Sequence, residues 1–466
     1  MKASETVSTG ERSLVDRKGL NVVKVAGGGG LTVELFPSGS IHTICCGDII
    51  INQWLAHPLE GGLNRLYLRR LDGSTIRYAP LVGPGSPSRF GADEHAARWE
   101  GTWEGLAYDV LLRVHPAKPV LFWTVSVRNT GTAAVRADVL YGQDIGLAGA
   151  GTVRSNEAYT CHYVDHRIET DPAIGPVVLT RQNNQQSPGS AFPWLLHGCL
   201  TGAEAFATDG FQFFGTEVKI DGEPAACRLP RLPSKKLQYE FGFIALQSRP
   251  LDLSPGAAAQ AEFFAWYEPE HAEASSPADL KHIAEARELR KSLPNASPAA
   301  KTPCAAGLYQ APLLDTVDFT DAEIAEHFGK DLRFVEKDGG KTLSFFSGAD
   351  SHVALKAKER ATERPHGHIL RTGQGLLPED AVMSGTCYAF GAFFSQITCG
   401  NTSFNKLFSV CRSHLNLIRT SGLRIWMSEG TTWKLLGVPS AFEMRPGLCR
   451  WLYKTADSLL EVRTAA

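Results

Sequence analysis

Polar and aromatic side chains gather between residues 141 and 166, among segments with the alternation of β-strands. Amide and carboxylate groups can bind sugar hydroxyls in pairs, and aromatic rings can pack against the C–H face of a sugar. The mixture therefore predicts a loop system that contacts a hydroxyl-rich ligand. The residues predicted to bind substrate are Gln143, Asp144, Arg154, Asn156, Glu157, Tyr159, Asp165 and His166.

A second interpretation of this run stays open. It can be a long crossover loop held by its own hydrogen bonds, with Asp165 and His166 closing a turn. Buried polar groups must be hydrogen-bonded in both cases, so composition does not separate the two.

Other segments offer little catalytic chemistry. His366 and His368 point the same way on an extended segment, as metal ligands can, but no third ligand stands at a diagnostic spacing. Interdomain hydrogen bonds are the better interpretation of that segment. Asp144 and Glu157 are candidates for the paired carboxylates of glycoside hydrolysis only because they are close in sequence. We therefore predict neither catalytic residues nor a metal site.

The composition is that of an ordinary globular protein. The chain has 466 residues, of which 43% are hydrophobic and 21% charged, and its net charge of −2 favours neither nucleic acid nor an anionic membrane. No apolar stretch approaches the roughly 20 residues that a membrane span needs. The ten cysteines lack zinc spacing and suggest reduced thiols, so we expect a cytoplasmic protein.

The pattern of the chain predicts a mainly β fold, with two antiparallel β-sandwich domains joined by a helical linker. We expect a first sandwich over residues 1–272, the linker over 273–300 and a second β-rich domain over 301–466. The expected strands of the first domain include 31–36, 41–44, 108–114, 120–128, 135–141, 211–214, 238–246 and 261–267.

Helix signals mark two places. Ser276 and Pro277 begin the linker helix, whose apolar stripe runs from Leu280 to Leu293. The capping box at residues 320–323 opens a short helix that ends at Gly329. The alternating segment 458–463 still continues near the end of the sequence, so we expect a chain that is truncated or completed by another polypeptide.

Several segments resemble the N-terminal, non-catalytic region of β-1,2-oligoglucan phosphorylases of glycoside hydrolase family 94, the former glycosyltransferase family 36. The resemblance covers most of residues 30–455, in the same order of segments. The first domain then corresponds to the β-supersandwich of that family. The segments are Phe36–His42, Pro58–Gly62, Leu66–Arg69, the run 141–166, Arg364–His368, Gly400–Asn405 and Val438–Glu443.

The resemblance implies an activity that this sequence does not contain in full. In the family, an (α/α)6 barrel follows the β regions, inorganic phosphate attacks the anomeric carbon with inversion, and an aspartic acid of the barrel protonates the leaving oxygen. No metal or organic cofactor is needed. The present sequence has no barrel, so it implies a support role: packing against a catalytic barrel in cis or in trans, contributing to a homodimer and bordering the cleft that binds a β-glucan oligosaccharide.

Two further functions remain open from the sequence. The chain can be a free-standing carbohydrate-binding protein, or a fragment of a cyclic β-1,2-glucan synthase-type protein, whose phosphorylase-like region shares this architecture. We expect the chain alone to be inactive in each case.

Overall fold

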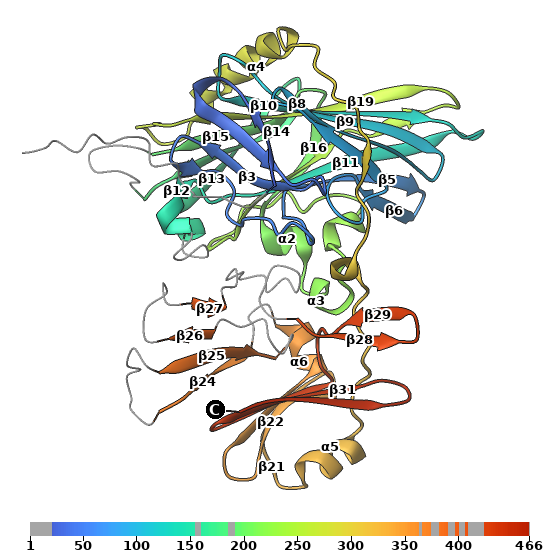
Figure 1. The fold of residues 1–466 in the computed structure, drawn as a ribbon, viewed down its shortest axis with the longest axis vertical. Helices are drawn as coiled ribbons and strands as arrows, with labels where there is room; N and C mark the ends of the chain where they lie inside the picture. Colours follow the sequence, from blue (N-terminus) through green and yellow to red (C-terminus); the bar gives the residue numbers. More distant parts are fainter. Residues whose placement is uncertain are drawn as a thin grey trace, which may run out of the picture.

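The computed structural model describes residues 21–153, 160–184, 192–362, 366–373, 382–389, 397–399, 406–408 and 424–465. Figure 1 shows two β-rich bodies, one above the other along the long axis of the molecule. The upper body holds the strands as far as β19 (Ala258–Glu268), and the lower body holds those from β21 (Leu332–Asp338) onward. The predicted class, mainly β with antiparallel sandwiches and a helix between them, is confirmed.

The first domain is built from sheets that we call I, II and III. The order of strands in sheet I is β13 (Val164–Asp171), β14 (Gly175–Gln182), β15 (Trp194–Cys199), β19, β10 (Val120–Asn129), β9 (Leu106–Val114), β8 (Ala96–Trp103), β7 (Ser88–Ala92) and β20 (Thr302–Pro303). Sheet II has the order β16 (Ala203–Asp209), β17 (Gly242–Ser248), β11 (Val135–Asp144), β5 (Arg65–Asp72) and β6 (Thr75–Pro80), and β18 (Leu251–Leu253) also pairs with β11. Sheet III has the order β1 (Val23–Ala26), β2 (Leu31–Leu35), β3 (Ile41–Cys46), β4 (Ile49–Ile50) and β12 (Ala148–Gly149).

Side chains alternate between two hydrophobic clusters along the strands of sheet II. On β11, Val139 and Tyr141 point into the main core between the sheets, whereas Leu140 points to the opposite face. Three short helices pack against that opposite face of sheet II: α2 (Gly210–Phe214), α3 (Val218–Asp221) and the 3-10 helix Ala225–Cys227. We call residues 210–232 the helical cover of sheet II; in Figure 1, α2 and α3 lie on the side of the first domain that faces the second.

A fully buried ion pair anchors the helical cover. Arg69 on β5 and Asp138 on β11 are both 0% exposed, and Nε and Nη2 of Arg69 donate to the two carboxylate oxygens over 2.7 and 2.6 Å. Nη1 donates to the backbone oxygens of Ala226, at 2.9 Å, and Leu229. Gln247 Nε2 donates to the same carboxylate at 2.8 Å. The guanidinium thus joins both sheet strands and the helical cover in one charge-assisted network.

The structure corrects one predicted element. The sequence predicts a strand over Phe211–Phe214, but these residues form α2. The carboxylate of Asp209 accepts a hydrogen bond from the Phe211 amide at 3.2 Å, which is an N-cap, and Gly215 ends the helix with a φ of +70°. A short apolar run fits a buried helix as well as a strand, and here the cap decides.

The predicted linker helix is confirmed. Ser276 and Asp279 form a capping box, in which the Ser276 amide donates to Asp279 Oδ2 at 2.7 Å, and α4 (Lys281–Lys291) follows. Ile283 and Ala286 of α4 pack against the outer face of sheet I. Beyond the helix, β20 pairs with β7 at the edge of the same sheet. The domain limits at 272 and 300 stay a prediction.

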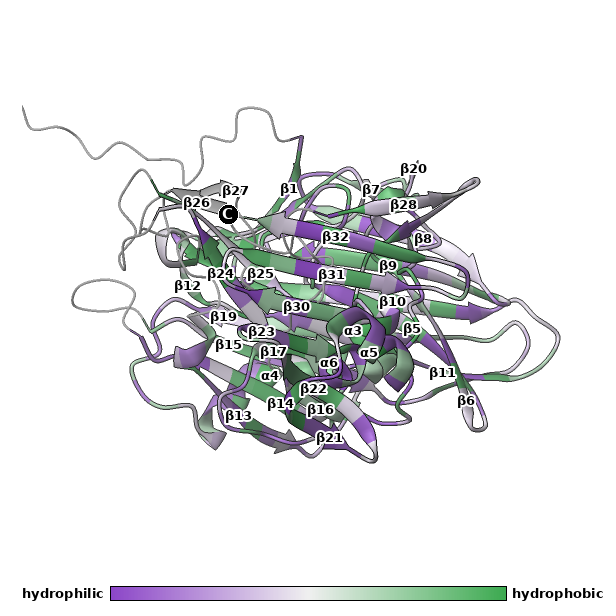
Figure 2. Cartoon of the chain, turned by 90° about the horizontal axis from the view of Figure 1, so that it is seen from below, coloured by the Kyte–Doolittle hydropathy of each residue, from purple (hydrophilic) through white to green (hydrophobic). Residues whose placement is uncertain are grey.

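The second domain contains sheets IV and V. Sheet IV has the order β21, β22 (Lys341–Ser347), β23 (Ser351–Leu355), β30 (Ala441–Arg445), β31 (Leu448–Lys454) and β32 (Leu459–Ala465). Sheet V has the order β24 (Gly367–Arg371), β25 (Met383–Tyr388), β26 (Ile397–Cys399) and β27 (Lys406–Phe408). Figure 2 shows hydrophobic and hydrophilic segments alternating along β31 and β32, as expected for strands with one packed face.

Helices and a hairpin complete this domain. The predicted capping box of α5 (Asp321–Phe328) is confirmed, since Thr320 and Glu323 bond each other's amides and the helix ends at Gly329. Helix α6 (Lys356–Ala361) follows β23, and β28 (Trp426–Glu429) pairs with β29 (Thr432–Leu435). No helix in the described ranges is both long and apolar enough to cross a membrane.

We predict that Arg69→Met lowers the free energy of unfolding by about 3–5 kcal/mol, because it leaves the Asp138 carboxylate buried without a cation. Urea unfolding followed by tryptophan fluorescence measures the change. Arg70→Met is the matched control on the same strand: its ion pair with Asp72 is partly exposed, so we expect a loss of no more than about 1 kcal/mol. Equal losses in both variants would contradict the anchoring role.

Candidate functional site

Two residues of the predicted polar run lie inside the first domain. Gln143 and Asp144 end β11 and are 0% and 1% exposed. The Tyr141 hydroxyl donates to Gln143 Oε1, and His197 Nε2 lies 3.4 Å from the same oxygen. Asp144 Oδ2 accepts hydrogen bonds from the backbone amides of Gln53 and Trp54, each at 2.7 Å. Burial raises the pKa of Asp144 to about 6, although these amide bonds oppose the shift.

Of the residues predicted to bind substrate, the other two that the structure describes belong to a different sheet. Asp165 and His166 lie on β13 of sheet I, whereas β11 belongs to sheet II. Asp165 is exposed and pairs with Lys236 at 2.9 Å. His166 is buried, its Nδ1 lies 3.0 Å from Thr180 Oγ1, and burial lowers its pKa to about 4. Arg154, Asn156, Glu157 and Tyr159 lie outside the described residues.

The described part of the run therefore does not share one surface. Gln143 and Asp144 lie on a strand and bond groups of the first domain outside the run, and Asp165 and His166 lie on β13 rather than closing a turn. The described residues therefore do not form the self-bonded crossover loop either. Sugar binding by the run as a whole stays a prediction.

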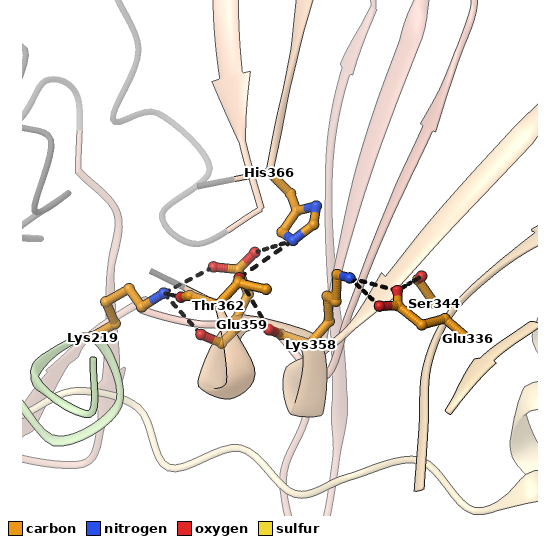
Figure 3. Close-up of polar contacts among 7 residues, drawn as sticks. All are labelled: Lys219, Glu336, Ser344, Lys358, Glu359, Thr362 and His366. Atoms are coloured by element: carbon orange, nitrogen blue, oxygen red, sulfur yellow. Dashed lines mark hydrogen bonds and ion pairs between the residues drawn. The ribbon is translucent and has the colours of Figure 1, made fainter. Parts of the chain in front are cut away.

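The structure brings a different polar cluster together, where the two domains meet (Figure 3). Lys219 on α3 of the first domain is 4% exposed, and its Nζ donates to the backbone oxygens of Glu359 and Thr362 at 2.8 and 2.9 Å. The Glu359 carboxylate, on α6 of the second domain, lies 3.5 Å from the same ammonium. The last carbonyls of a helix lack partners within the helix and carry partial negative charge, so Lys219 acts as a cap delivered from the other domain.

The cluster continues into the second domain from Glu359. Glu359 is 2% exposed, and burial raises the pKa of its carboxyl while Lys219 opposes that shift. His366 Nε2 lies 3.4 Å from Thr362 Oγ1 and 4.0 Å from Glu359 Oε1. Burial, with a contribution from nearby lysines, lowers the pKa of His366 to about 4, so the imidazole is neutral at pH 7. The sequence predicts interdomain hydrogen bonds for this histidine segment, but these contacts of the His366 ring stay within the second domain, and Lys219 makes the interdomain contact instead.

A second ion pair joins the domains at the β28–β29 hairpin. Arg424, just before β28, pairs with Glu60 of the first domain, and the two side chains are 9% and 5% exposed. The Arg424 guanidinium also lies 5.3 Å from the centre of the Tyr309 ring. Leu435 and Val438 form a small apolar cluster with Ile220 of α3. Charge, aromatic and apolar contacts thus fix the relative position of the domains.

These contacts hold the two domains together and orient them. The described residues contain no group of three or more His, Cys, Asp or Glu side chains placed to bind a metal. Sequence reasoning missed Lys219 and Glu359, which stand 140 residues apart. Neither residue belongs to a recognisable motif. The available sign of the contact was a lysine within the short segment 218–221, and a single charged residue is a weak signal of burial.

Comparison with known proteins connects both domains to one family. Residues 34–265 match the SOGP N-terminal domain, and residues 331–466 match the glycoside phosphorylase supersandwich domain, so the supersandwich match falls on the second domain and not on the first, where the resemblance had placed it. Over 434 residues, 93% of this chain, the sequence is 33% identical to a 1,2-β-oligoglucan phosphorylase of Listeria innocua. The chain belongs to the family whose members carry the SOGP N-terminal domain followed by the glycoside phosphorylase supersandwich domain. Members of this family can be longer: the chain spans 38% of the length of the Listeria protein.

The solved structures that align with this chain share little sequence with it. A polysaccharide lyase aligns with 94% of this chain and 46% of its own, at 11% identity and a TM-score of 0.35. A bacterial glucoamylase in complex with acarbose aligns with 59% of this chain and 37% of its own, at 8% identity and a TM-score of 0.33.

We predict that Lys219→Met loosens the contact between the domains, because it removes the cation from Glu359 and from the end of α6. Limited trypsin digestion at Lys301, in the connection between the domains, should become faster, and the free energy of unfolding should fall by about 3–5 kcal/mol. Adding Glu359→Gln should restore part of the loss, since it removes the unpaired charge. Lys236→Met, which breaks an exposed pair within the first domain, is the control. Additive effects of Lys219→Met and Glu359→Gln would contradict the coupling.

We predict that the contribution of Asp144 to the free energy of unfolding decreases as the pH rises. Its folded pKa of about 6 lies above the ordinary aspartate value, so the folded state binds the proton more tightly than the unfolded state. Its contribution to stability should therefore fall by about 3 kcal/mol as the pH rises from about 4 to about 6. Asp144→Asn keeps an oxygen for the two amides and carries no charge.

The measurement is the difference in unfolding free energy between wild type and Asp144→Asn from pH 4 to pH 7. The buried His166 and His197 titrate in both proteins and cancel in the difference. We expect wild type to lose stability relative to the variant as the pH rises. A difference that stays constant over this range would show that Asp144 is not held in a desolvated site.

Proposed function

We propose that the chain is the carbohydrate-binding and scaffold part of a glycoside phosphorylase that acts on β-1,2-glucooligosaccharides with inorganic phosphate. An (α/α)6 catalytic barrel, in cis or in trans, is the proposed partner that carries the chemistry. The observation that carries the proposal is the pair of domain matches: both non-catalytic domain types stand in this chain, and it is 33% identical to a 1,2-β-oligoglucan phosphorylase over 93% of its length.

The geometry between the domains supports the scaffold role. A lysine cap, a buried ion pair and an apolar cluster hold the two β domains in one arrangement. A rigid pair of domains can present a constant surface to a catalytic barrel or to a second copy of the chain. Because such a surface can also contact a second copy of the chain, the proposal includes a homodimer.

The carbohydrate-binding role includes the run 141–166 as a border of the oligosaccharide cleft. Gln143, Asp144 and His166 are buried, so their proposed role there is to support the loop from below. Of the four residues of the predicted site that the structure describes, Asp165 is the exposed one, so its proposed role is direct contact with the sugar. A cytoplasmic location completes the proposal; the eight cysteines with described side chains are all free thiols, as in a reducing compartment.

We predict that the purified chain forms no glucose 1-phosphate from sophorotetraose and inorganic phosphate. The assay measures glucose 1-phosphate with the chain alone and with a catalytic barrel region supplied as a separate polypeptide. Activity on mixing, above that of the barrel alone, is the expected result for a scaffold acting in trans. Phosphorolysis by the chain alone would contradict the proposal. Sugar binding alone, with no effect on a barrel, would favour the free-standing carbohydrate-binding protein.

A further inference from the structure

A cavity of about 410 Å³ lies beside the contact between the domains. Its walls come from β5 and β6 of sheet II, from the helical cover, and from the connection to the second domain through Gln310 and Leu313. In Figure 1 the cover lies between the two bodies, and the connection passes beside it. The volume is within the range of ordinary small-molecule sites.

Two tyrosines form one corner of the cavity. Tyr67 on β5 and Tyr78 on β6 lie with ring centres 6.0 Å apart and ring planes at 68°. Burial raises the pKa of both hydroxyls, and neither makes a hydrogen bond to another described residue, so both remain neutral groups able to donate and to accept. Phe214 of α2 adds an apolar wall.

Arg65 lies in the same cavity in a fixed orientation. Its Nε, Nη1 and Nη2 donate to the backbone oxygens of Gly62, Val82 and Glu60 at 2.7, 2.9 and 3.4 Å. Two glycines with φ of +91° and +85° allow this fit: a Cβ at Gly61 would lie 2.7 Å from Nη2, and one at Gly83 would lie 2.8 Å from Nη1. A guanidinium has five N–H groups, so two remain for a ligand.

The charges of the described lining favour a neutral ligand. Glu60 and Arg65 are its charged side chains, and they carry opposite signs. Glu60 is also paired with Arg424, and most of the Arg65 donors are bonded to carbonyls. An anion such as phosphate would be repelled by the Glu60 carboxylate, and the described lining has no cluster of cations to bind it. Aromatic faces, free hydroxyls and fixed N–H donors suit a hydroxyl-rich, uncharged molecule instead.

We propose that this cavity binds a glucosyl unit of a β-1,2-glucooligosaccharide, with the sugar against the rings of Tyr67 and Tyr78 and its hydroxyls bonded by the tyrosine hydroxyls and Arg65. This site is distinct from the run 141–166, and it rests on the proposed function for the identity of the sugar. Because Gln310 and Leu313 close it from the interdomain connection, the bound sugar also contacts the segment that links the domains.

The experiment is calorimetric titration of the full chain with sophorotriose. The test variant is Tyr67→Phe/Tyr78→Phe, which keeps both rings and removes only the hydroxyls. We expect its affinity to fall at least about tenfold, the ratio that corresponds to about 1.4 kcal/mol. The matched control is Tyr239→Phe, since Tyr239 is 86% exposed and does not line the cavity; its affinity should equal that of wild type. A second test variant, Tyr78→Ala, removes a ring as well.

The outcomes separate the cavity from the proposed function. If wild type binds sophorotriose and both test variants bind it equally well, the cavity proposal is wrong and carbohydrate binding stands elsewhere in the chain. If wild type does not bind, the carbohydrate-binding part of the proposed function fails together with the cavity. A titration with inorganic phosphate tests the charge argument: phosphate binding that the test variants abolish would overturn the assignment to a neutral ligand.

Discussion

The buried pair of Arg69 and Asp138 is the constraint on which the rest of the structure depends. A charge inside a β domain is tolerated only when it is paired and fully bonded, and Arg69 meets that requirement by bonding the carbonyl oxygens of the helical cover as well as Asp138. The same contacts that satisfy the charge therefore determine where residues 225–232 lie on sheet II. The cover could not shift without leaving the guanidinium unsatisfied.

The position of the cover determines the interdomain contact. The cover carries Lys219 at the correct place to cap α6, and it supplies Phe214 and Val218 to the wall of the tyrosine cavity. A single buried charge network in the first domain is thus connected, through short helices, to the docking of the second. This arrangement agrees with a scaffold, in which two β domains keep one geometry, better than with independent modules on a mobile connection.

Local signals in the sequence predicted the secondary structure and the fold class, but they did not reveal contacts between residues far apart in the chain. The strand at Val120–Asn129 and the capped helices after Ser276 and Thr320 are visible because alternation and capping are properties of neighbouring residues. The strand expected at Phe211–Phe214 is a helix, since four apolar residues suit both and a single aspartate decides. The burial of Gln143 follows from its place on the inner face of β11, which depends on register with β17. The cap by Lys219 joins residues 140 positions apart, and no spacing rule reveals it.

The most direct test of the account is a crystal structure of the chain soaked with sophorotriose. The account predicts difference density for a glucosyl unit between Tyr67, Tyr78 and Arg65, with the Lys219 cap on α6 intact and the domains in the arrangement described. Density for the sugar elsewhere, with the tyrosine cavity empty, would contradict the cavity as the sugar site. An arrangement of domains without the Lys219 cap would contradict the rigid scaffold itself.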